Sequence, residues 1–158
     1  MNRLTKTLLL ILLWSAAFLT SGCIDKTFKP EAALEIPQVN PYELYATATD
    51  TASLPTTTIT VNSINQIPSN LKSYSISYYT KYGEMIPSLT VNSTPIELKL
   101  DAAGTISITV KPYTSRVVDL FDLSNSDISP VTARINLVFQ DYNDNIINKE
   151  AHCLLYKP

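Results

Sequence analysis

The length, composition and charge of the chain exclude several classes of protein. Its 158 residues suit one domain, and 45% of them are hydrophobic, which excludes a chain that is disordered throughout. The formal net charge of -2 and the 16% of charged residues exclude a strongly basic nucleic-acid-binding protein and a strongly acidic tail. No nucleic-acid partner is therefore expected.

Residues 1–22 have the three parts of an export signal. Arg3 and Lys6 make a short basic start, and Leu8–Phe18 form an uncharged, mostly apolar run. Small residues follow, in the segment Leu19–Cys23. The apolar run has the length of a signal-peptide core and is too short to span a bilayer comfortably as a permanent helix.

The segment Leu19–Cys23 resembles the lipobox of bacterial lipoproteins. In that family a small residue precedes an invariant Cys, which is diacylated before the leader is cut on its amino side. The resemblance implies cleavage between Gly22 and Cys23 and a covalent lipid on Cys23. The commonest lipobox has Leu three residues before the Cys, whereas this sequence has Thr20, an accepted variant.

The same resemblance implies a location in the bacterial cell envelope. Two or more acyl chains are needed for lasting anchorage, and a mature lipoprotein carries at least two. In Gram-negative lipoproteins an Asp directly after the Cys favours retention in the inner membrane. Here that residue is Ile24, so the outer membrane is the expected destination. Apart from the lipid on Cys23, no cofactor is expected.

The mature chain is predicted to divide into a tether and a domain. Residues 23–40 begin with the Cys that the resemblance implies is lipidated. They contain Pro30 and Pro37 and show no clear period, which indicates a flexible tether, with at most one short strand at Leu34–Ile36. Residues 41–158 are predicted to form a β-sandwich.

Short β-rich runs broken by Pro, Asn, Gly, Asp and Ser predict the strands of this domain. Alternation of Tyr74, Ile76 and Tyr78 with serines predicts a strand with one buried face. The residues at 117–123 are predicted as a short helical turn or an irregular crossover. The predicted strands are Tyr42–Thr49, Thr56–Ile64, Leu71–Tyr82, Leu89–Asn92, Ile96–Leu100, Thr105–Lys111, a run from Val131 to Phe139, and Ile147–Tyr156.

The last two runs form the clearest pattern. Alternate residues from Val131 to Phe139 are apolar, and the turn-rich segment Asp141–Asn145 joins that run to the final one, which predicts a β-hairpin. About seven to eight short strands predict an all-β antiparallel sandwich. Its spacing resembles immunoglobulin-like and fibronectin type III domains in architecture only, because the mature chain lacks the Cys-Trp-Cys pattern.

Few residues could carry chemistry, so no enzyme is expected. His152 is the only histidine, and no nucleophile motif accompanies it. Neighbours on a strand point to opposite faces, so His152 and Cys153 are not expected to form a catalytic pair. With Cys23 acylated, Cys153 has no disulfide partner and is expected to be a small buried apolar residue.

The Asp141–Asn145 segment allows two interpretations. Asp141, Asn143 and Asn145 match the first half of a calcium-loop pattern. However, Ile146 stands where the pattern has Gly, and His152 stands where it has an acidic ligand. A tight turn is the main expectation, and a weak calcium site is the alternative.

Tyrosines offer the remaining signal for function. Tyr79 and Tyr82 fall on or near the outer face of the predicted strand, beside Lys81. They form either a binding surface or a pair that stabilises the sheet, and we favour the stabilising pair. The leading hypothesis is a non-catalytic, membrane-anchored β-sandwich that binds another envelope protein or supports an envelope assembly. The alternative is a carbohydrate- or small-ligand-binding module that uses exposed tyrosines, with or without calcium.

Overall fold

Strands dominate the part of the chain that the structure describes. This computed structural model describes residues 29–45, 54–123 and 128–157, so the predicted leader, Gly22 and Cys23 lie outside the described residues. All of the described helices and strands belong to one compact unit, Glu31–Pro158. Among the described residues, no helix combines the length and the apolar character that crossing a membrane requires.

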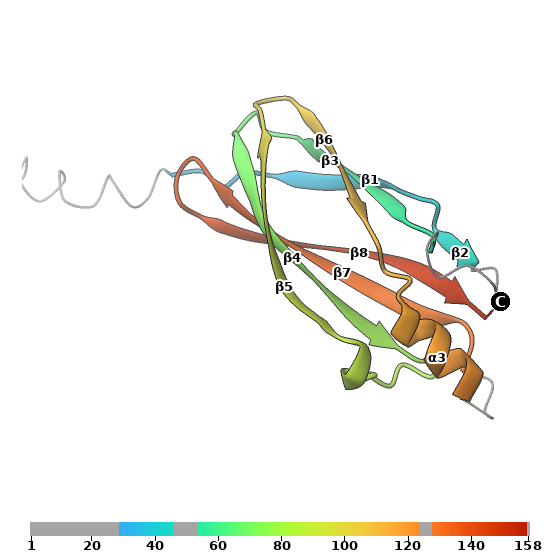
Figure 1. The fold of residues 1–158 in the computed structure, drawn as a ribbon. Coiled ribbons are helices and arrows are strands. Elements are labelled where there is room, and N and C mark those ends of the chain that lie inside the picture. The colour runs from blue at the N-terminus through green and yellow to red at the C-terminus, as the bar shows by residue number, and fades with distance from the viewer. Residues whose placement is uncertain (1–28, 46–53, 124–127, 158) are drawn as a thin grey trace, which may run out of the picture. The chain divides into compact units, whose positions relative to one another are not determined.

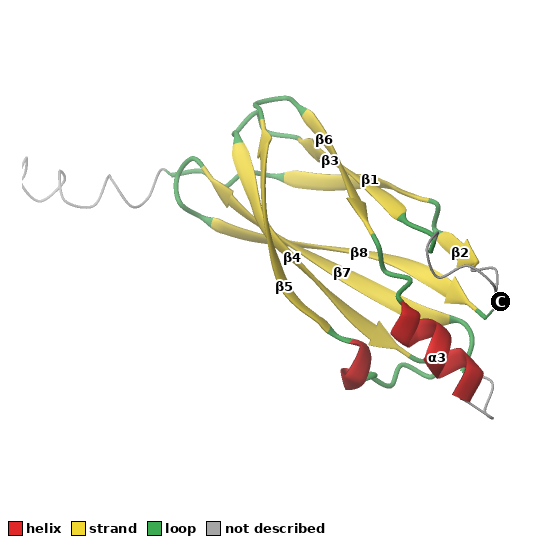
Figure 2. Cartoon of the chain, in the orientation of Figure 1, coloured by secondary structure: helices red, strands yellow, loops and turns green. Residues whose placement is uncertain are grey.

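The strands form two sheets (Figures 1 and 2). The first sheet has the order β1-β3-β6 and is antiparallel, with β1 at Leu34–Asn40, β3 at Thr57–Ser63 and β6 at Thr105–Val110. The second has the order β2-β8-β7-β4-β5, with β2 at Glu43–Tyr45, β8 at Ile146–Tyr156, β7 at Val131–Asp141, β4 at Ser69–Tyr79 and β5 at Val91–Leu100. In the second sheet β2 runs parallel to β8, and the other neighbours are antiparallel.

Both sheets contribute to one hydrophobic core. Alternate residues of β3 and β6 are buried, and they belong to the same cluster as the inward-facing residues of β4, β7 and β8. Burial of one face of each sheet is the dominant favourable contribution to folding. The predicted all-β class is confirmed, and the two sheets are arranged in the manner of a sandwich.

The predicted hairpin of the last two runs is confirmed. β7 and β8 pair in antiparallel register from Val131 opposite Leu155 to Gln140 opposite Ile146. Every second residue of β7 is fully buried, as the alternation predicted. The row of inward-facing residues extends beyond Phe139 to Asp141, whose carboxylate is buried at the end of the strand.

A β-bulge explains the burial pattern of β4. Its register with β7 shifts between Leu71 and Ser73, so Lys72 is the additional residue. Leu71 before the bulge and Ile76 and Tyr78 after it therefore all face the core, although Ile76 lies five positions after Leu71 and a regular strand would put the two on opposite faces. The predicted inner face is thus confirmed for Ile76 and Tyr78.

Two segments differ from the sequence-based expectations. The residues Leu34–Asn40, expected to belong to the tether apart from one short strand, form the edge strand β1. Its register shifts between Glu35 and Gln38, which accommodates Pro37 because proline has no N–H to donate to the ladder.

The runs expected as separate strands at 89–92 and 96–100 are one continuous strand, β5, which contains Pro95. β5 also lies at a sheet edge, where a missing N–H is tolerated. Of the run expected at 42–49, Glu43–Tyr45 form β2, and the residues after Tyr45 lie outside the described part.

The helical candidate is a true α-helix, α3 (Ser115–Leu123), and a short 3-10 helix, η2 (Pro87–Leu89), precedes β5. Val117 and Phe121, four residues apart, are buried on one side of α3. Tyr113, just before the helix, donates its hydroxyl proton to the carbonyl of Tyr156 over 2.7 Å. The crossover from β6 to β7 is therefore attached to the end of β8.

Candidate functional site

The outer face of the five-stranded sheet carries a cluster of aromatic and charged side chains beside β2. We call this cluster the aromatic face, and it comprises Tyr42, Glu43, Tyr45, Tyr79, Arg134, His152 and Tyr156. Side chains alternate between the two faces of a strand, so the residues of β8 next to buried ones point outward. Ala151 and Cys153 are buried, whereas His152 between them is exposed.

The parallel pairing of β2 with β8 builds the first half of the aromatic face. It places Tyr45 opposite Tyr156, and their rings stack with centroids 4.8 Å apart and an interplanar angle of 11°. Glu43 lies on the same side, and its carboxylate accepts hydrogen bonds from Tyr45 Oη over 2.8 Å and from Tyr156 Oη over 3.4 Å. One carboxylate thus fixes both phenols.

Glu43 also makes these phenols less acidic. The hydrogen bond to Glu43 raises the pKa of Tyr45, and partial desolvation and the negative charge of Glu43 add to the effect. Desolvation raises the pKa of Tyr156, again with a contribution from Glu43. A tyrosine with an ordinary pKa is already protonated at neutral pH, and these upward shifts act in the same direction, so both phenols are neutral hydrogen-bonding groups.

The second half of the aromatic face continues across β8, β7 and β4. Tyr42 meets the His152 ring edge-on, with centroids 5.4 Å apart. His152 pairs in register with Arg134 of β7, and the Arg134 guanidinium lies 4.3 Å from the centre of the Tyr79 ring on β4. A cation over an aromatic ring at this distance is attracted by the ring's quadrupole. The face therefore extends over four adjacent strands.

The two tyrosines that the sequence suggested as a binding surface lie in different settings. Tyr79 is half-buried on β4 and belongs to the aromatic face through Arg134. Tyr82 lies in the turn after β4, is 75% exposed, and has Lys81 Nζ 5.4 Å from its ring centre. Within the described residues no ring contact joins Tyr79 to Tyr82.

Sequence reasoning did not identify Tyr42, Tyr45 and Tyr156 as a group. They come from opposite ends of the domain sequence, and only the β2–β8 pairing brings them together. The local signal was present in part, since Tyr156 falls on the same face of its strand as His152. The identity of the neighbouring strand is not encoded in that alternation.

Cys153 lies on the opposite side of β8 from the aromatic face. It is fully buried and free, and burial raises the pKa of its thiol to about 12. A thiol that is protonated and inaccessible is a poor nucleophile. His152 is exposed on the other side of the strand, as the alternation predicted.

The Asp141–Asn145 segment is a tight turn held by its own aspartate. Asp141 Oδ1 accepts hydrogen bonds from the backbone N–H groups of Asn143 over 2.8 Å and Asn145 over 2.9 Å. Its Oδ2 accepts from Asn145 Nδ2 over 2.9 Å and from the backbone N–H of Ala32 over 3.0 Å. The carboxylate thereby joins the hairpin turn to the beginning of the unit.

Burial by itself would raise the pKa of Asp141, but its hydrogen bonds outweigh burial and hold the pKa below the ordinary value of 3.8. The structure thus gives this carboxylate a structural role. Within the described residues, no group of three or more His, Cys, Asp or Glu side chains could hold a metal ion. The calcium alternative at Asp141, Asn143 and Asn145 stays a prediction.

Comparisons with known proteins do not extend this picture. The sequence matches no protein-family model and no curated protein. Among solved structures, the fold is similar to part of the alkylpurine DNA glycosylase AlkC of Pseudomonas fluorescens, bound to DNA with an abasic site analogue. That match has a TM-score of 0.43 and 15% identity, and it covers 80% of this chain but 31% of the glycosylase.

A second similar structure is an X-ray structure of a Northeast Structural Genomics Consortium target. The TM-score is 0.41 and the identity 10%, with 81% of this chain and 85% of the target covered. Both TM-scores are low, so neither likeness bears on the function of this chain.

Proposed function

We propose that the protein is a lipid-anchored component of the bacterial cell envelope and that its β domain, without catalysis of its own, binds another envelope protein through the aromatic face. The anchor is supported by the lipobox-like segment Leu19–Cys23. By the residue after Cys23, the proposed membrane is the outer one in a Gram-negative cell. The observation that carries the binding proposal is the exposed and internally ordered aromatic face beside β2.

The composition of the aromatic face favours a protein partner. Tyrosine and arginine are enriched at protein interfaces, where a few such residues contribute most of the binding free energy. Tyr45 is 59% exposed, so much of its surface is available to be buried by a partner. Burial of apolar surface contributes roughly 25 cal/mol per Å² before the costs of association are subtracted.

The contacts within the aromatic face lower one cost of association, the loss of side-chain conformational entropy. Glu43 holds the phenols of Tyr45 and Tyr156, and the two rings stack on each other. Side chains that are held before binding lose less rotamer entropy when a partner arrives, and each immobilised side chain otherwise costs about 0.5–1.5 kcal/mol. The face is therefore partly preorganised.

The stacking geometry favours a protein over a sugar. A sugar-binding platform presents its aromatic rings side by side, so that one face of each ring is open to the ligand. Tyr45 and Tyr156 instead cover one face of each other. The short strand β2 also lies at the edge of its sheet, a position at which an extended segment of a partner can add.

We further propose that the sandwich is of the immunoglobulin-like kind. The alternation of the chain between the two sheets supports this proposal, since β3 and β6 lie in one sheet while β4, β5, β7 and β8 lie in the other. Such exchanges are characteristic of Greek-key sandwiches. An experimentally determined structure with a different strand order would contradict it.

The binding proposal is tested by affinity capture from envelope extracts. The parent protein and the double variant Tyr45→Ala/Tyr156→Ala are used as baits, with Tyr82→Ala as the matched control, because Tyr82 is exposed and lies outside the aromatic face. A protein partner retained by the parent and by Tyr82→Ala should bind the double variant at least ~10-fold more weakly, as loss of interface anchors predicts. Equal recovery with all three baits would exclude the aromatic face as the binding surface.

The same baits distinguish the carbohydrate alternative. The purified parent protein is offered envelope polysaccharides from which protein has been removed. We expect no retention of the polysaccharide. Retention that the Tyr45→Ala/Tyr156→Ala double variant loses would overturn the protein-partner proposal in favour of sugar binding.

A further inference from the structure

Three connections and the first residues of the unit are bonded together at one end of the unit, which we call the proximal end. Ala32 donates its N–H to Asp141 in the β7–β8 turn. Ala33 donates its N–H to Asn65 Oδ1 over 2.8 Å, and its carbonyl accepts the N–H of Ile64 over 2.8 Å. The β3–β4 connection thereby borders both the first residues of the unit and the β7–β8 turn.

The other connections complete this end. The N–H of Tyr142 in the β7–β8 turn donates to the carbonyl of Pro68 over 3.1 Å. Gly104, in the β5–β6 turn, accepts a hydrogen bond from Ser63 N over 3.1 Å. An open hollow of about 510 Å³ lies between these turns, and Tyr142, Pro68 and Ala102 are among its lining residues. The proximal end is thus a hydrogen-bonded platform of short turns.

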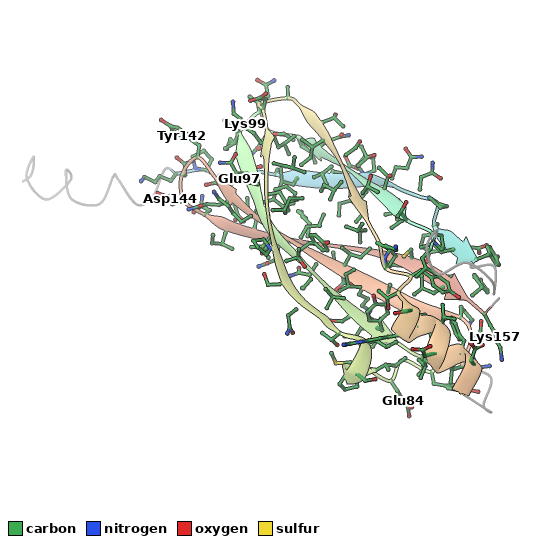
Figure 3. All side chains as sticks on the ribbon, in the orientation of Figure 1. Glu84, Glu97, Lys99, Tyr142, Asp144 and Lys157 are labelled. Carbon is green, nitrogen blue, oxygen red and sulfur yellow. The ribbon has the colours of Figure 1, made fainter. Side chains whose placement is uncertain are left out.

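This platform exposes apolar side chains. Tyr142 is 84% exposed, Ile64 is 59% exposed and Ile146 is 57% exposed. Figure 3 shows the Tyr142 and Asp144 side chains at this end of the unit, with Glu84 and Lys157 at the opposite end. Large apolar side chains that gather on an exposed surface are typical of interaction sites.

Charged side chains also lie at the proximal end. Lys99 and Asp101, at the β5–β6 turn, form an ion pair of 2.7 Å. The carboxylate of Asp144 accepts a hydrogen bond from Gln140 over 3.0 Å. The Lys99–Asp101 pair has no net charge, whereas Asp144 keeps its negative charge because the Gln140 amide is neutral. The docking proposed below for this end therefore rests on its exposed apolar side chains and not on charge.

The covalent length of the chain indicates which partner this is. Glu31, where the unit begins, is the eighth residue after Cys23, and a fully extended chain spans at most about 3.3–3.6 Å per residue. A lipid on Cys23 therefore keeps the first residue of the unit within about 30 Å of its own attachment point. The proximal end contains that first residue, so a lipid on Cys23 would limit how far this end can move from the bilayer.

We propose that the proximal end docks on the membrane to which Cys23 is anchored, with Tyr142, Ile64 and Ile146 inserted into the interfacial layer of the bilayer. This inference rests on the proposed lipid anchor. Tyrosine is enriched at the membrane interface because its ring is apolar and its hydroxyl remains hydrated. The tether makes the docking intramolecular, so that a modest apolar contact is sufficient.

The experiment uses a tryptophan reporter in the lipidated protein. The only tryptophan of the chain, Trp14, lies in the predicted leader, so the processed protein has none. Tyr142→Trp places a reporter at the proximal end, and Tyr82→Trp places the matched control on a turn of similar exposure beyond the opposite end of β4. Both proteins are purified with their lipid, reconstituted in phosphatidylcholine vesicles, and compared with vesicles that contain brominated phosphatidylcholine.

The expected result is a blue shift of the Tyr142→Trp emission on reconstitution and quenching by the brominated lipid, with neither effect in Tyr82→Trp. Emission of Tyr142→Trp that stays unshifted and unquenched, in a protein whose Cys23 is shown by mass spectrometry to carry lipid, would overturn the docking and leave the anchor intact. Mass spectra that show no lipid on Cys23 would overturn the anchor, and the docking proposal with it.

Discussion

At the scale of single residues, Asp141 connects the two ends of the described domain sequence. It is buried at the end of the inward row of β7, and its carboxylate accepts four hydrogen bonds, one of them from Ala32 more than a hundred residues earlier in the chain. Hydrogen bonds to charged groups contribute about 1.5–3 kcal/mol each, but several of these donors would be hydrated if the carboxylate were removed.

Replacement of this carboxylate should destabilise the protein in a pH-dependent way. We expect Asp141→Ala to lower the free energy of unfolding by about 3 kcal/mol at pH 7. The hydrogen bonds keep the pKa of Asp141 below 3.8, so its contribution is fully present above that value and is lost as the pH falls through the folded-state pKa. Urea unfolding of parent and variant at pH 7 and pH 2 measures this, and the difference should shrink at pH 2.

The control for this prediction is Asp119→Ala, which removes an exposed carboxylate from α3. Its effect should stay within about 0.5 kcal/mol at either pH. If Asp141→Ala proved as stable as Asp119→Ala at pH 7, the structural role of the Asp141 carboxylate would be refuted.

Ser69 presents the opposite situation, a buried polar atom that no described residue satisfies. Within the part of the chain that the structure describes, its hydroxyl oxygen has no hydrogen-bond partner, and the residue faces inward at the start of β4. An unsatisfied buried hydroxyl costs about 1–3 kcal/mol relative to a hydrated one. We therefore expect Ser69→Ala to raise the free energy of unfolding by about 1 kcal/mol.

The same denaturation series measures the Ser69→Ala effect. Ser77→Ala on the outer face of the same strand is the control and should be neutral within about 0.5 kcal/mol. A clear loss of stability in Ser69→Ala alone would show that the hydroxyl is satisfied in solution.

At the scale of elements, α3 shows how a short amphipathic segment closes one end of the core. Val117 and Phe121 are buried on one side, and the Phe121 ring lies 6.1 Å from that of Tyr113, centre to centre. A nine-residue helix is too short to be stable alone, so packing of this side must hold it in place.

Truncation of the buried side of α3 should therefore be costly. Phe121→Ala is expected to lower the free energy of unfolding by about 3–5 kcal/mol, because it leaves a cavity in the core. Arg116→Ala removes an exposed side chain from the same helix and should change stability by less than about 0.5 kcal/mol. Thermal unfolding followed by circular dichroism distinguishes the two, and equal melting temperatures would show that α3 does not contribute to the core.

At the scale of the whole molecule, the proposed lipid on Cys23 and the proposed docking of the proximal end would both keep that end of the unit at the membrane. An anchor at Cys23 would hold the proximal end near the bilayer, whereas Lys157, in the segment after β8, lies at the opposite end (Figure 3). The aromatic face begins at Tyr45 and Tyr156, at the ends of β2 and β8, and continues toward the middle of the sheet. A partner could then reach the aromatic face while the proximal end contacts lipid.

Removal of the anchoring residue should abolish this arrangement. Cys23→Ala is expected to accumulate as an uncleaved precursor without lipid, because the proposed anchor requires acyl chains to attach to that thiol before the leader is cut. Mass spectrometry of the N-terminal peptide and separation of membranes from soluble proteins measure the result. A Cys23→Ala protein that is processed and held in membranes like the parent would contradict the lipoprotein proposal.

The fold could be predicted from the sequence to a large extent, because alternation is a local signal. The inward row of β7, the hairpin with β8, and the opposite orientations of His152 and Cys153 all follow from the two-residue period of a strand. Strand ends were predicted less well where a local rule has an exception, as with Pro95 within the edge strand β5.

By itself, the sequence determined the all-β class and the faces of the strongest strands, and it supplied the lipobox-like segment from which the anchor is proposed. Only the tertiary structure decided which strands are neighbours. The observed arrangement stacks the Tyr45 ring on Tyr156 and puts the Arg134 guanidinium over the Tyr79 ring. It also brings the N–H of Ala32 to the Asp141 carboxylate. The physical reason is that the strand period reports which face a residue occupies, whereas the neighbour across the sheet depends on contacts between segments far apart in the chain.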